Sequence, residues 1–227
     1  WIDVIKRAWS EPDEFDFDGK FFKLAGVHCL PGPFGGTRPV IMNAGASATG
    51  QAFAMRNCDA FFTSTAALRL AVAGTANDAN VSVFDRIVAQ VARIKAEAKA
   101  FGRDIEVFTQ GQVICRPTQQ EAEDYHRHAN VDNADWPALE RMLALKNITP
   151  QNTPAAEFAA KRSLQAVSGV GGFPFVGTPD KVAQEFADIG RAGVRGIAVS
   201  FVNYVEEVPY FCAEVLPRLK RIGLRAN

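Results

Sequence analysis

The feature that most constrains the fold is a repeated alternation of short apolar runs with longer segments of helical periodicity. The apolar runs lie at 39–43, 59–63, 105–115 and 196–201. Runs of this kind are typical of strands buried on both faces, as in a parallel sheet covered by helices. Segments whose apolar residues recur every three or four positions lie between and after these runs. This order predicts an α/β fold with four strand–helix units.

Four strand–helix units make half of an eight-stranded TIM barrel, which usually needs about 250 residues. An open, doubly wound sheet is the alternative, but no Gly-x-Gly-x-x-Gly follows any of the apolar runs. The pattern therefore favours a TIM (β/α)8 barrel of which about the carboxyl-terminal half is present. The chain opens at Trp1 inside a helical pattern, so we expect an amino-terminally truncated piece of something longer. Half a barrel would leave two sheet edges unpaired.

Residues 1–227 are expected to form a single domain with two departures from the barrel pattern. The first, at 14–36, alternates phenylalanine with polar residues around Asp18-Gly19, which predicts a hairpin followed by a Pro/Gly-rich loop. The second, at 148–173, combines a short helix with a flexible Ser/Gly-rich run at 168–172. Periodic order resumes directly afterwards, which favours an inserted mobile lid over a linker.

Three longer helices are predicted from periodicity and capping residues. Apolar spacing predicts a helix over 84–101. A capping box of Thr118 and Glu121 opens a helix predicted to run over 118–145. A closing helix is predicted over about 208–222.

Charge and cysteine content exclude several classes of function. Lys+Arg and Asp+Glu both total 25, so no net charge attracts nucleic acid or an anionic membrane surface. No apolar run approaches the roughly 20 residues of a membrane span, and the first residues lack a signal-peptide pattern. The 4 cysteines form no Cys-x-x-Cys pair, and His28, His126 and His128 form no metal pattern. We therefore expect a cytoplasmic protein with reduced thiols and no metal, nucleic acid or membrane partner.

A small-residue loop follows the first apolar run and is the main candidate site. The segment 39–50 passes from apolar residues into Gly45, and an amphipathic helix follows. At a helix start several backbone N–H groups lack carbonyl partners, and the helix dipole adds partial positive charge. Together with the hydroxyls of Ser47 and Thr49, this loop can seat an anion such as a phosphate. The alternative is that Ser47 is only an N-cap and the glycines only permit a tight turn.

Two glutamines on the run at 105–115 form a second candidate site. Gln110 and Gln112 share one face of the expected strand, because side chains alternate between faces. Two amides side by side on a buried strand need hydrogen-bond partners. An amide offers a donor and an acceptor but no charge, so it suits a neutral polar ligand. The alternative is that the two amides pair with each other or with the barrel interior.

Five segments of the chain, taken in order, carry a family resemblance. They are Asn43–Gly50, Val113–Thr118, Val176–Val182, Ala198–Tyr204 and Glu214–Leu219. In this order they resemble the carboxyl-terminal part of the bacterial-luciferase-like, flavin-dependent monooxygenases. The resemblance covers essentially the whole chain. It is strongest toward the two-component branch that oxidises alkanesulfonates, dimethyl sulfone and pyrimidines.

The resemblance implies a luciferase-like TIM barrel that takes reduced FMN as a co-substrate from a separate NAD(P)H-dependent flavin reductase. The activity implied is the use of O2 to oxygenate a small organic substrate, such as a sulfone, a sulfonate or an amide-like compound. In this family the segment matching 43–50 holds the FMN phosphate, which assigns cofactor binding to Asn43, Gly45, Ala46 and Ser47.

Substrate binding is implied for Gln110 and Gln112, because inward side chains on this strand include basic residues in sulfonate-oxidising relatives. Glutamines there suit a neutral polar substrate. The segment 148–173 resembles the insertion that closes over substrate and flavin and excludes water. Catalytic residues are expected upstream of Trp1, and a homo-oligomer is expected. Two alternatives stay open: a deazaflavin-dependent oxidoreductase of the same superfamily, and a non-catalytic half-barrel that binds flavin or serves in assembly.

Overall fold

A computed structural model describes residues 1–63, 82–167 and 172–225. The helices are α1 (Ile2–Ser10), α2 (Ala48–Asn57), α4 (Val83–Ala100), α5 (Gln119–Arg127), α6 (Trp136–Leu145), α7 (Ala155–Val167), α8 (Pro179–Arg191) and α9 (Tyr204–Arg221). The strands are β1 (Phe15–Asp18), β2 (Lys23–Val27), β3 (Met42–Asn43), β4 (Ala60–Phe62), β5 (Glu106–Cys115), β6 (Phe173–Gly177) and β7 (Val194–Ser200). A 3-10 turn covers Phe34–Gly36 and a π-helical turn covers His128–Asp132.

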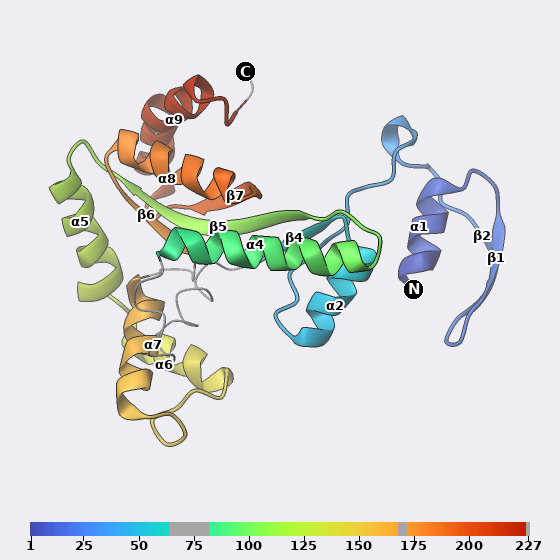
Figure 1. Cartoon of the computed structure of the whole chain (residues 1–227), viewed down its shortest axis with the longest axis horizontal. Coiled ribbons are helices and arrows are strands. Elements are labelled where there is room, and N and C mark those ends of the chain that lie inside the picture. Colours follow the sequence, from blue (N-terminus) through green and yellow to red (C-terminus); the bar gives the residue numbers. More distant parts are fainter. Residues whose placement is uncertain (64–81, 168–171, 226–227) are drawn as a thin grey trace.

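The main sheet is parallel and is organised around the long strand β5 (Figure 1). Val107 and Phe108 pair with both β4 and β7, so these two strands lie on opposite edges of β5. Gly111 and Gln112 pair with both β6 and β7, so β6 lies on the same edge as β4, farther along β5. Every pairing in this sheet is parallel, which confirms the predicted parallel α/β sheet.

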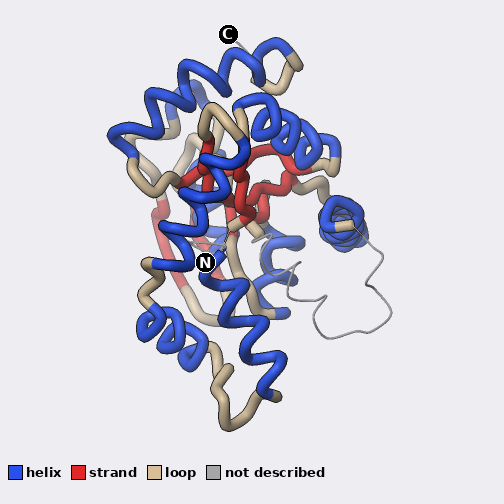
Figure 2. Tube along the Cα trace, turned by 90° about the vertical axis from the view of Figure 1, so that its left-hand side faces the viewer, coloured by secondary structure: helices blue, strands red, loops and turns tan. Residues whose placement is uncertain are grey.

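Helices pack on one face of this sheet and enclose the hydrophobic core. Alternate strand residues, among them Phe61, Val107, Val113 and Phe175, are buried against α2, α4, α8 and α9. Helices α8 and α9 pack against each other over the sheet (Figures 1 and 2). Gly111 lies on this face because a Cβ there would approach the Phe175 ring to 2.3 Å. The residues of the opposite face, by register, include Phe108, Gln110 and Gln112.

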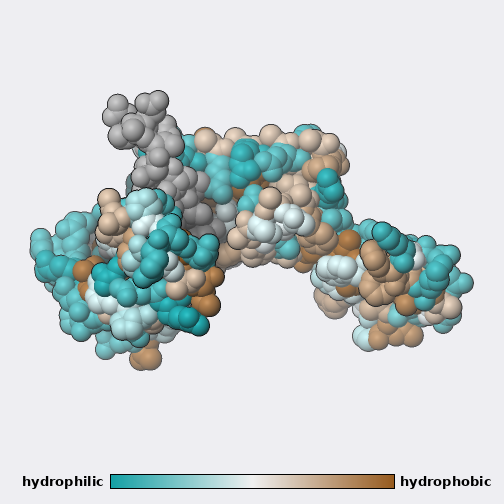
Figure 3. Space-filling model, turned by 90° about the horizontal axis from the view of Figure 1, so that it is seen from below, coloured by the Kyte–Doolittle hydropathy of each residue, from teal (hydrophilic) through white to brown (hydrophobic). Residues whose placement is uncertain are grey.

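The amino-terminal part forms a separate unit at one end of the molecule (Figures 1 and 3). Strands β1 and β2 are antiparallel, which confirms the predicted hairpin, and the N–H of Gly19 closes the turn on the Phe22 carbonyl at 2.8 Å. Helix α1 reaches the sheet domain through Trp1, whose ring stacks on Phe53 of α2 at 6.0 Å between centroids. Opposite this unit, α5, α6 and α7 project as an arm, and the surface between the two projections is indented (Figure 3).

The strand predicted at 39–43 is shorter than expected and comprises Met42–Asn43. Pro39 has no N–H to donate, and the N–H of Ile41 donates to the Asp59 carboxylate at 3.0 Å instead of to a strand. Conversely, β6 was not expected. The strand tolerates Pro174 because β6 pairs with β5 alone among the described strands, so this proline sits in an edge strand.

The single helix predicted over 118–145 is wrong, because the chain breaks it into α5, a π-helical turn and α6. The capping box of Thr118 and Glu121 opens α5 as predicted. Asp135 then caps a new helix by accepting a hydrogen bond from the N–H of Ala138 at 3.0 Å. The closing helix begins earlier than predicted, at Tyr204, because Asn203 caps it. The helix predicted over 84–101 is confirmed as α4, whereas 168–171 lie outside the described residues.

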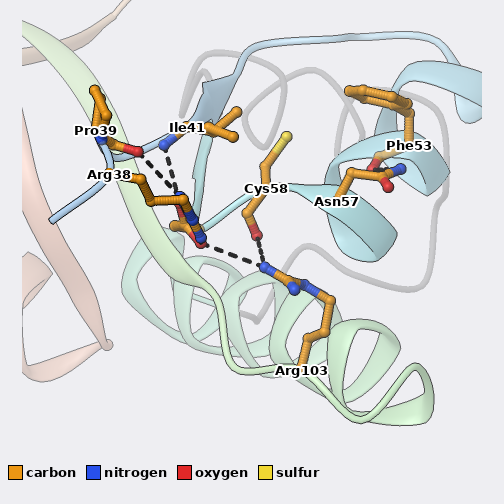
Figure 4. A network of polar contacts seen from close by, with 8 residues as sticks. Arg38, Pro39, Ile41, Phe53, Asn57, Cys58 and Arg103 are labelled. Atoms are coloured by element: carbon orange, nitrogen blue, oxygen red, sulfur yellow. Dashed lines mark hydrogen bonds and ion pairs between the residues drawn. The ribbon is translucent and has the colours of Figure 1, made fainter. Parts of the chain in front are cut away.

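Asp59, the residue before β4, holds together the amino-terminal end of the sheet through Arg38 and Arg103, which Figure 4 labels. Its two carboxylate oxygens accept hydrogen bonds from the Arg38 guanidinium at 2.6 and 2.7 Å. Arg103 adds a longer contact to the same carboxylate at 3.4 Å and a hydrogen bond to the Cys58 carbonyl at 3.0 Å. The Arg38 hydrogen bond lowers the pKa of Asp59 from 3.8 to about 2.

This depressed pKa predicts a loss of stability in acid. The carboxyl of Asp59 protonates near pH 3.8 in the unfolded chain and near pH 2 in the folded chain. Its stabilisation is therefore complete above pH 3.8 and is lost as the pH falls toward 2. The expected loss is about 2 kcal/mol. Denaturant unfolding of the parent and of Asp59→Asn between pH 6 and pH 2 checks this. The stability difference between the two should shrink with acidification; a constant difference would contradict the prediction.

Candidate functional site

The loop between β3 and α2 places a helix amino terminus at the carboxyl end of the sheet. Ser47 is the N-cap of α2: its Oγ accepts a hydrogen bond from the N–H of Gly50 at 3.1 Å. The interpretation of Ser47 as an N-cap is therefore correct. It does not exclude anion binding, because the hydroxyl proton makes no hydrogen bond to a described residue and is free to be donated. Ser47 is exposed.

Backbone donors gather around Ser47. The N–H groups of residues 46, 47, 48 and 49 make no hydrogen bond to any carbonyl or side chain within the described parts of the chain. The N–H of Gly45 is already used, because the Asn43 side chain accepts it at 2.7 Å. Asn43 therefore shapes the loop through its own amide, while Ala46 and Ser47 present N–H groups outward at the positive end of the α2 dipole.

Two glycines allow the loop to fold back on the helix. A Cβ on Gly45 would lie 2.8 Å from the Cα of Gly50 and 2.9 Å from Oδ1 of Asn43. A Cβ on Gly50 would lie 3.0 Å from the Cα of Gly45. Backbone therefore meets backbone at this point, and any side chain there would push the loop off the helix start. The result is a compact turn at the amino terminus of α2, where N–H groups without partners can bind a phosphate group.

Gln110 and Gln112 lie on the sheet face opposite the helices, as their alternation predicted. Gln112 is 6% exposed, and its Oε1 accepts a hydrogen bond from Nδ2 of Asn130 at 2.6 Å. Its register partner on β7 is Ser200, which shares the same face. The two glutamines belong to β5 and the phosphate loop follows β3. Parallel strands all have their carboxyl ends on the same side of the sheet. Both candidate sites therefore lie toward the carboxyl end of the sheet.

The contact of Asn130 with Gln112 was not predicted from the sequence. Asn130 is only 8% exposed and lies in the π-helical turn between α5 and α6. The signal was present as an Asn-Val-Asp-Asn run, since asparagine and aspartate are weak helix formers inside a helix.

A second missed contact joins the end of β5 to α9. Arg116 donates to the buried Glu207 at 2.7 Å, and its guanidinium lies 3.9 Å from the Tyr125 ring centroid. The other Glu207 oxygen accepts the N–H of Asn203 at 2.8 Å. A cavity of about 310 Å³ adjoins this pair and is lined by Cys115, Arg116, Pro117, Glu206, Glu207 and Tyr210. Burial raises the pKa of the Cys115 thiol to about 11, so this thiol stays protonated.

The two cations of the segment 148–173, Lys161 and Arg162, form ion pairs with residues of α7 and α6. Lys161 pairs with Glu157 at 2.5 Å within α7. Arg162 pairs with Glu140 of α6 at 2.7 Å and lies 3.9 Å from the Trp136 ring centroid. These contacts tie α7 to α6.

All 4 cysteines are free thiols, as predicted. Within 1–63, 82–167 and 172–225, no group of three or more His, Cys, Asp or Glu is placed to hold a metal ion. In the same ranges, no helix combines the length and the apolar character needed to cross a membrane.

Comparison with known proteins identifies the family. The model of the luciferase-like monooxygenases matches residues 1–196. The chain belongs to the luciferase-like monooxygenase family. The resemblance seen in the sequence is thus confirmed over most of the chain.

Named relatives in this family match the chain over nearly all its length. An FMNH2-dependent dimethylsulfone monooxygenase of Pseudomonas fluorescens (strain Pf0-1) is 27% identical, over 100% of this chain and 58% of the relative. A dimethyl-sulfide monooxygenase of Hyphomicrobium sulfonivorans is also 27% identical, over 94% of this chain and 47% of the relative. The chain therefore spans about half the length of these relatives.

The fold is shared with solved structures of the family. The crystal structure of DmoA from Hyphomicrobium sulfonivorans superposes with a TM-score of 0.74 at 21% identity, and covers 100% of this chain and 55% of that one. A match over about half of the solved chain agrees with a partial barrel, here a 5-stranded parallel sheet with its covering helices.

Proposed function

We propose that this chain is part of an FMNH2-dependent monooxygenase that uses O2 to oxygenate a small organic substrate. The observation that carries the proposal is the set of open backbone amides at the start of α2, beside the Ser47 hydroxyl. A doubly charged phosphate ester is the ligand that such a set stabilises best, because each N–H donor is charge-assisted and the helix dipole adds to the attraction. When bound, the reduced flavin supplies the electrons that activate O2.

In this proposal Asn43, Gly45, Ala46 and Ser47 form the phosphate site. Ala46 and Ser47 donate backbone N–H groups, and Ser47 adds its hydroxyl. Gly45 permits the close approach of the loop, and Asn43 holds the N–H of Gly45 so that the turn keeps its shape. Membership in a family with FMNH2-dependent relatives supports FMN as the phosphate ester.

Gln110 and Gln112 are proposed to contact the substrate. Both lie on the sheet face opposite the one that α2, α4, α8 and α9 cover, toward the same strand ends as the phosphate loop. Their neutral amides favour a sulfone, a sulfoxide or an amide over a sulfonate, whose charge they leave without a counter-ion. The segment 148–173 is proposed to close over the bound molecules and exclude water.

We further propose that a separate NAD(P)H-dependent reductase delivers the flavin in the cytoplasm, and that the chain self-associates. The direct test mixes the chain anaerobically with dithionite-reduced FMN and follows flavin fluorescence, with reduced riboflavin as the control that lacks the phosphate. Reduced FMN should bind at least tenfold more tightly than riboflavin, since the phosphate adds at least one charged hydrogen bond.

Oxygen uptake then tests the reaction. With a flavin reductase, NADH and FMN, dimethyl sulfone should raise the rate of oxygen consumption. Failure of reduced FMN to bind would overturn the proposal. Binding of a reduced deazaflavin in place of FMNH2 would support the deazaflavin-dependent alternative, and a stable flavin-free dimer would support a role in assembly only.

A further inference from the structure

Two nearly buried amides face each other above the sheet. Gln112 on β5 is 6% exposed and Asn130 in the π-helical turn is 8% exposed. Nδ2 of Asn130 donates to Oε1 of Gln112 at 2.6 Å. Buried polar groups are costly unless they are paired, so this contact holds both side chains in one orientation.

The direction of this hydrogen bond decides what Gln112 can offer to a ligand. Because Oε1 is occupied by Asn130, the group left over is the Nε2 amide, which carries two N–H donors. Nε2 makes no hydrogen bond to any residue in the described parts of the chain. The face on which it lies carries Ser200 as its register partner.

The π-helical turn brings Asn130 to the sheet. The turn interrupts the helical segment after α5 and buries Asn130, whereas His128 at its start and Asn133, its C-cap, are exposed. The Asn133 side chain bonds back to the His128 carbonyl at 3.0 Å and so closes the turn on itself. Insertions of this kind inside helices frequently mark functional sites.

We infer that Asn130 is a positioning residue that turns the Gln112 amide so that the site presents N–H donors and selects ligands by their acceptor oxygens. Sulfone and sulfoxide oxygens fit this requirement, since they accept hydrogen bonds and donate none. The ligand class rests on the proposed function, in which Gln112 contacts the substrate. The orientation of the amide does not, because it follows from the contact between Asn130 and Gln112.

The test is the substitution Asn130→Asp. An ionised carboxylate only accepts hydrogen bonds, so Gln112 must turn its Nε2 toward position 130 and leave Oε1 facing the ligand. The affinity for dimethyl sulfone should fall about tenfold, the loss expected for one hydrogen bond. The control is Asp132→Asn, which exchanges the same two chemical groups in the same turn at an exposed side chain whose ion pair with Arg127 is long, at 3.9 Å. That variant should retain the parent affinity.

Side-chain amide NMR of the 15N-labelled chain reads the orientation without any ligand. Both side chains are about equally buried, so in the parent the hydrogen-bonded Asn130 amide protons should exchange more slowly than those of Gln112. Asn130→Asp should transfer the protection to Gln112. Gln112 amide protons that exchange as slowly as those of Asn130, or more slowly, in the parent would overturn the inference, whatever the flavin experiments show.

The binding measurement separates the two proposals further. If Asn130→Asp and Asp132→Asn lose sulfone affinity equally, the turn acts only through general structure and the positioning role is refuted. If the parent does not bind dimethyl sulfone at all, the ligand class is refuted, while the NMR result still decides the orientation. FMNH2 binding and oxygen uptake remain the independent measures of the proposed function.

Discussion

Replacing Ser47 by aspartate is expected to weaken FMN binding about 100-fold while the folded state stays intact. Aspartate is as good an N-cap as serine, so the N–H of Gly50 keeps an acceptor and α2 keeps its start. The new carboxylate, however, stands where the phosphate is proposed to bind. It replaces a donated hydrogen bond to an anion, worth about 1.5–3 kcal/mol, with repulsion between like charges.

Riboflavin and thermal unfolding provide the controls for Ser47→Asp. Riboflavin has no phosphate, so its affinity should be the same for the parent and the variant, and the melting temperature should be unchanged. Titration calorimetry or flavin fluorescence measures both ligands. Equal FMN affinities for the parent and Ser47→Asp would place the phosphate elsewhere and leave Ser47 as a helix cap.

Glu207→Ala is expected to destabilise the chain by about 3–5 kcal/mol, because it breaks a buried ion pair by removing one partner. Arg116 would remain, 22% exposed, without its carboxylate. The N–H of Asn203 at the start of α9 would lose its acceptor as well. The two ends of the pair are 91 residues apart in sequence, so the contact joins the turn after β5 to the last helix.

Glu207→Gln is the matched control, since it keeps the shape and one acceptor oxygen but removes the charge. Its loss should be clearly smaller than that of Glu207→Ala. Urea unfolding followed by circular dichroism measures both variants. A loss below about 1 kcal/mol for Glu207→Ala would mean that the pair behaves like an exposed surface ion pair.

The parts of the fold that local periodicity controls were predictable from the sequence. The apolar spacing of α4, the Thr118–Glu121 capping box and the hairpin around Asp18-Gly19 all depend on residues close together in the chain. The candidate phosphate loop belongs to this group, because N-capping by Ser47 is a contact over three residues. Its proposed binding role remains a prediction.

The features that were not predicted depend on partners distant in sequence. For Gln112 the sequence predicted substrate binding, with pairing to Gln110 or to the barrel interior as the alternative. Its described partner, Asn130, lies 18 residues away in a turn that periodicity had assigned to one helix. Strand β6 contains Pro174, and proline is unfavourable within a sheet because it has no N–H to donate. Pairing with β5 alone among the described strands removes this cost, since an edge strand needs hydrogen bonds on one side only. The ion pair of Arg116 with Glu207 cannot be predicted from neighbouring residues, because its partners are 91 residues apart.

The contact between Gly45 and Gly50 has a consequence for how this loop can change. Where two side chains collide, a second-site suppressor can relieve the strain by shrinking one of them. Here each residue already lacks a side chain, and the clash would be with main-chain atoms 2.8–3.0 Å away. An enlarging mutation at either position therefore has no compensating partner, and we expect revertants selected against such a mutation to restore glycine itself.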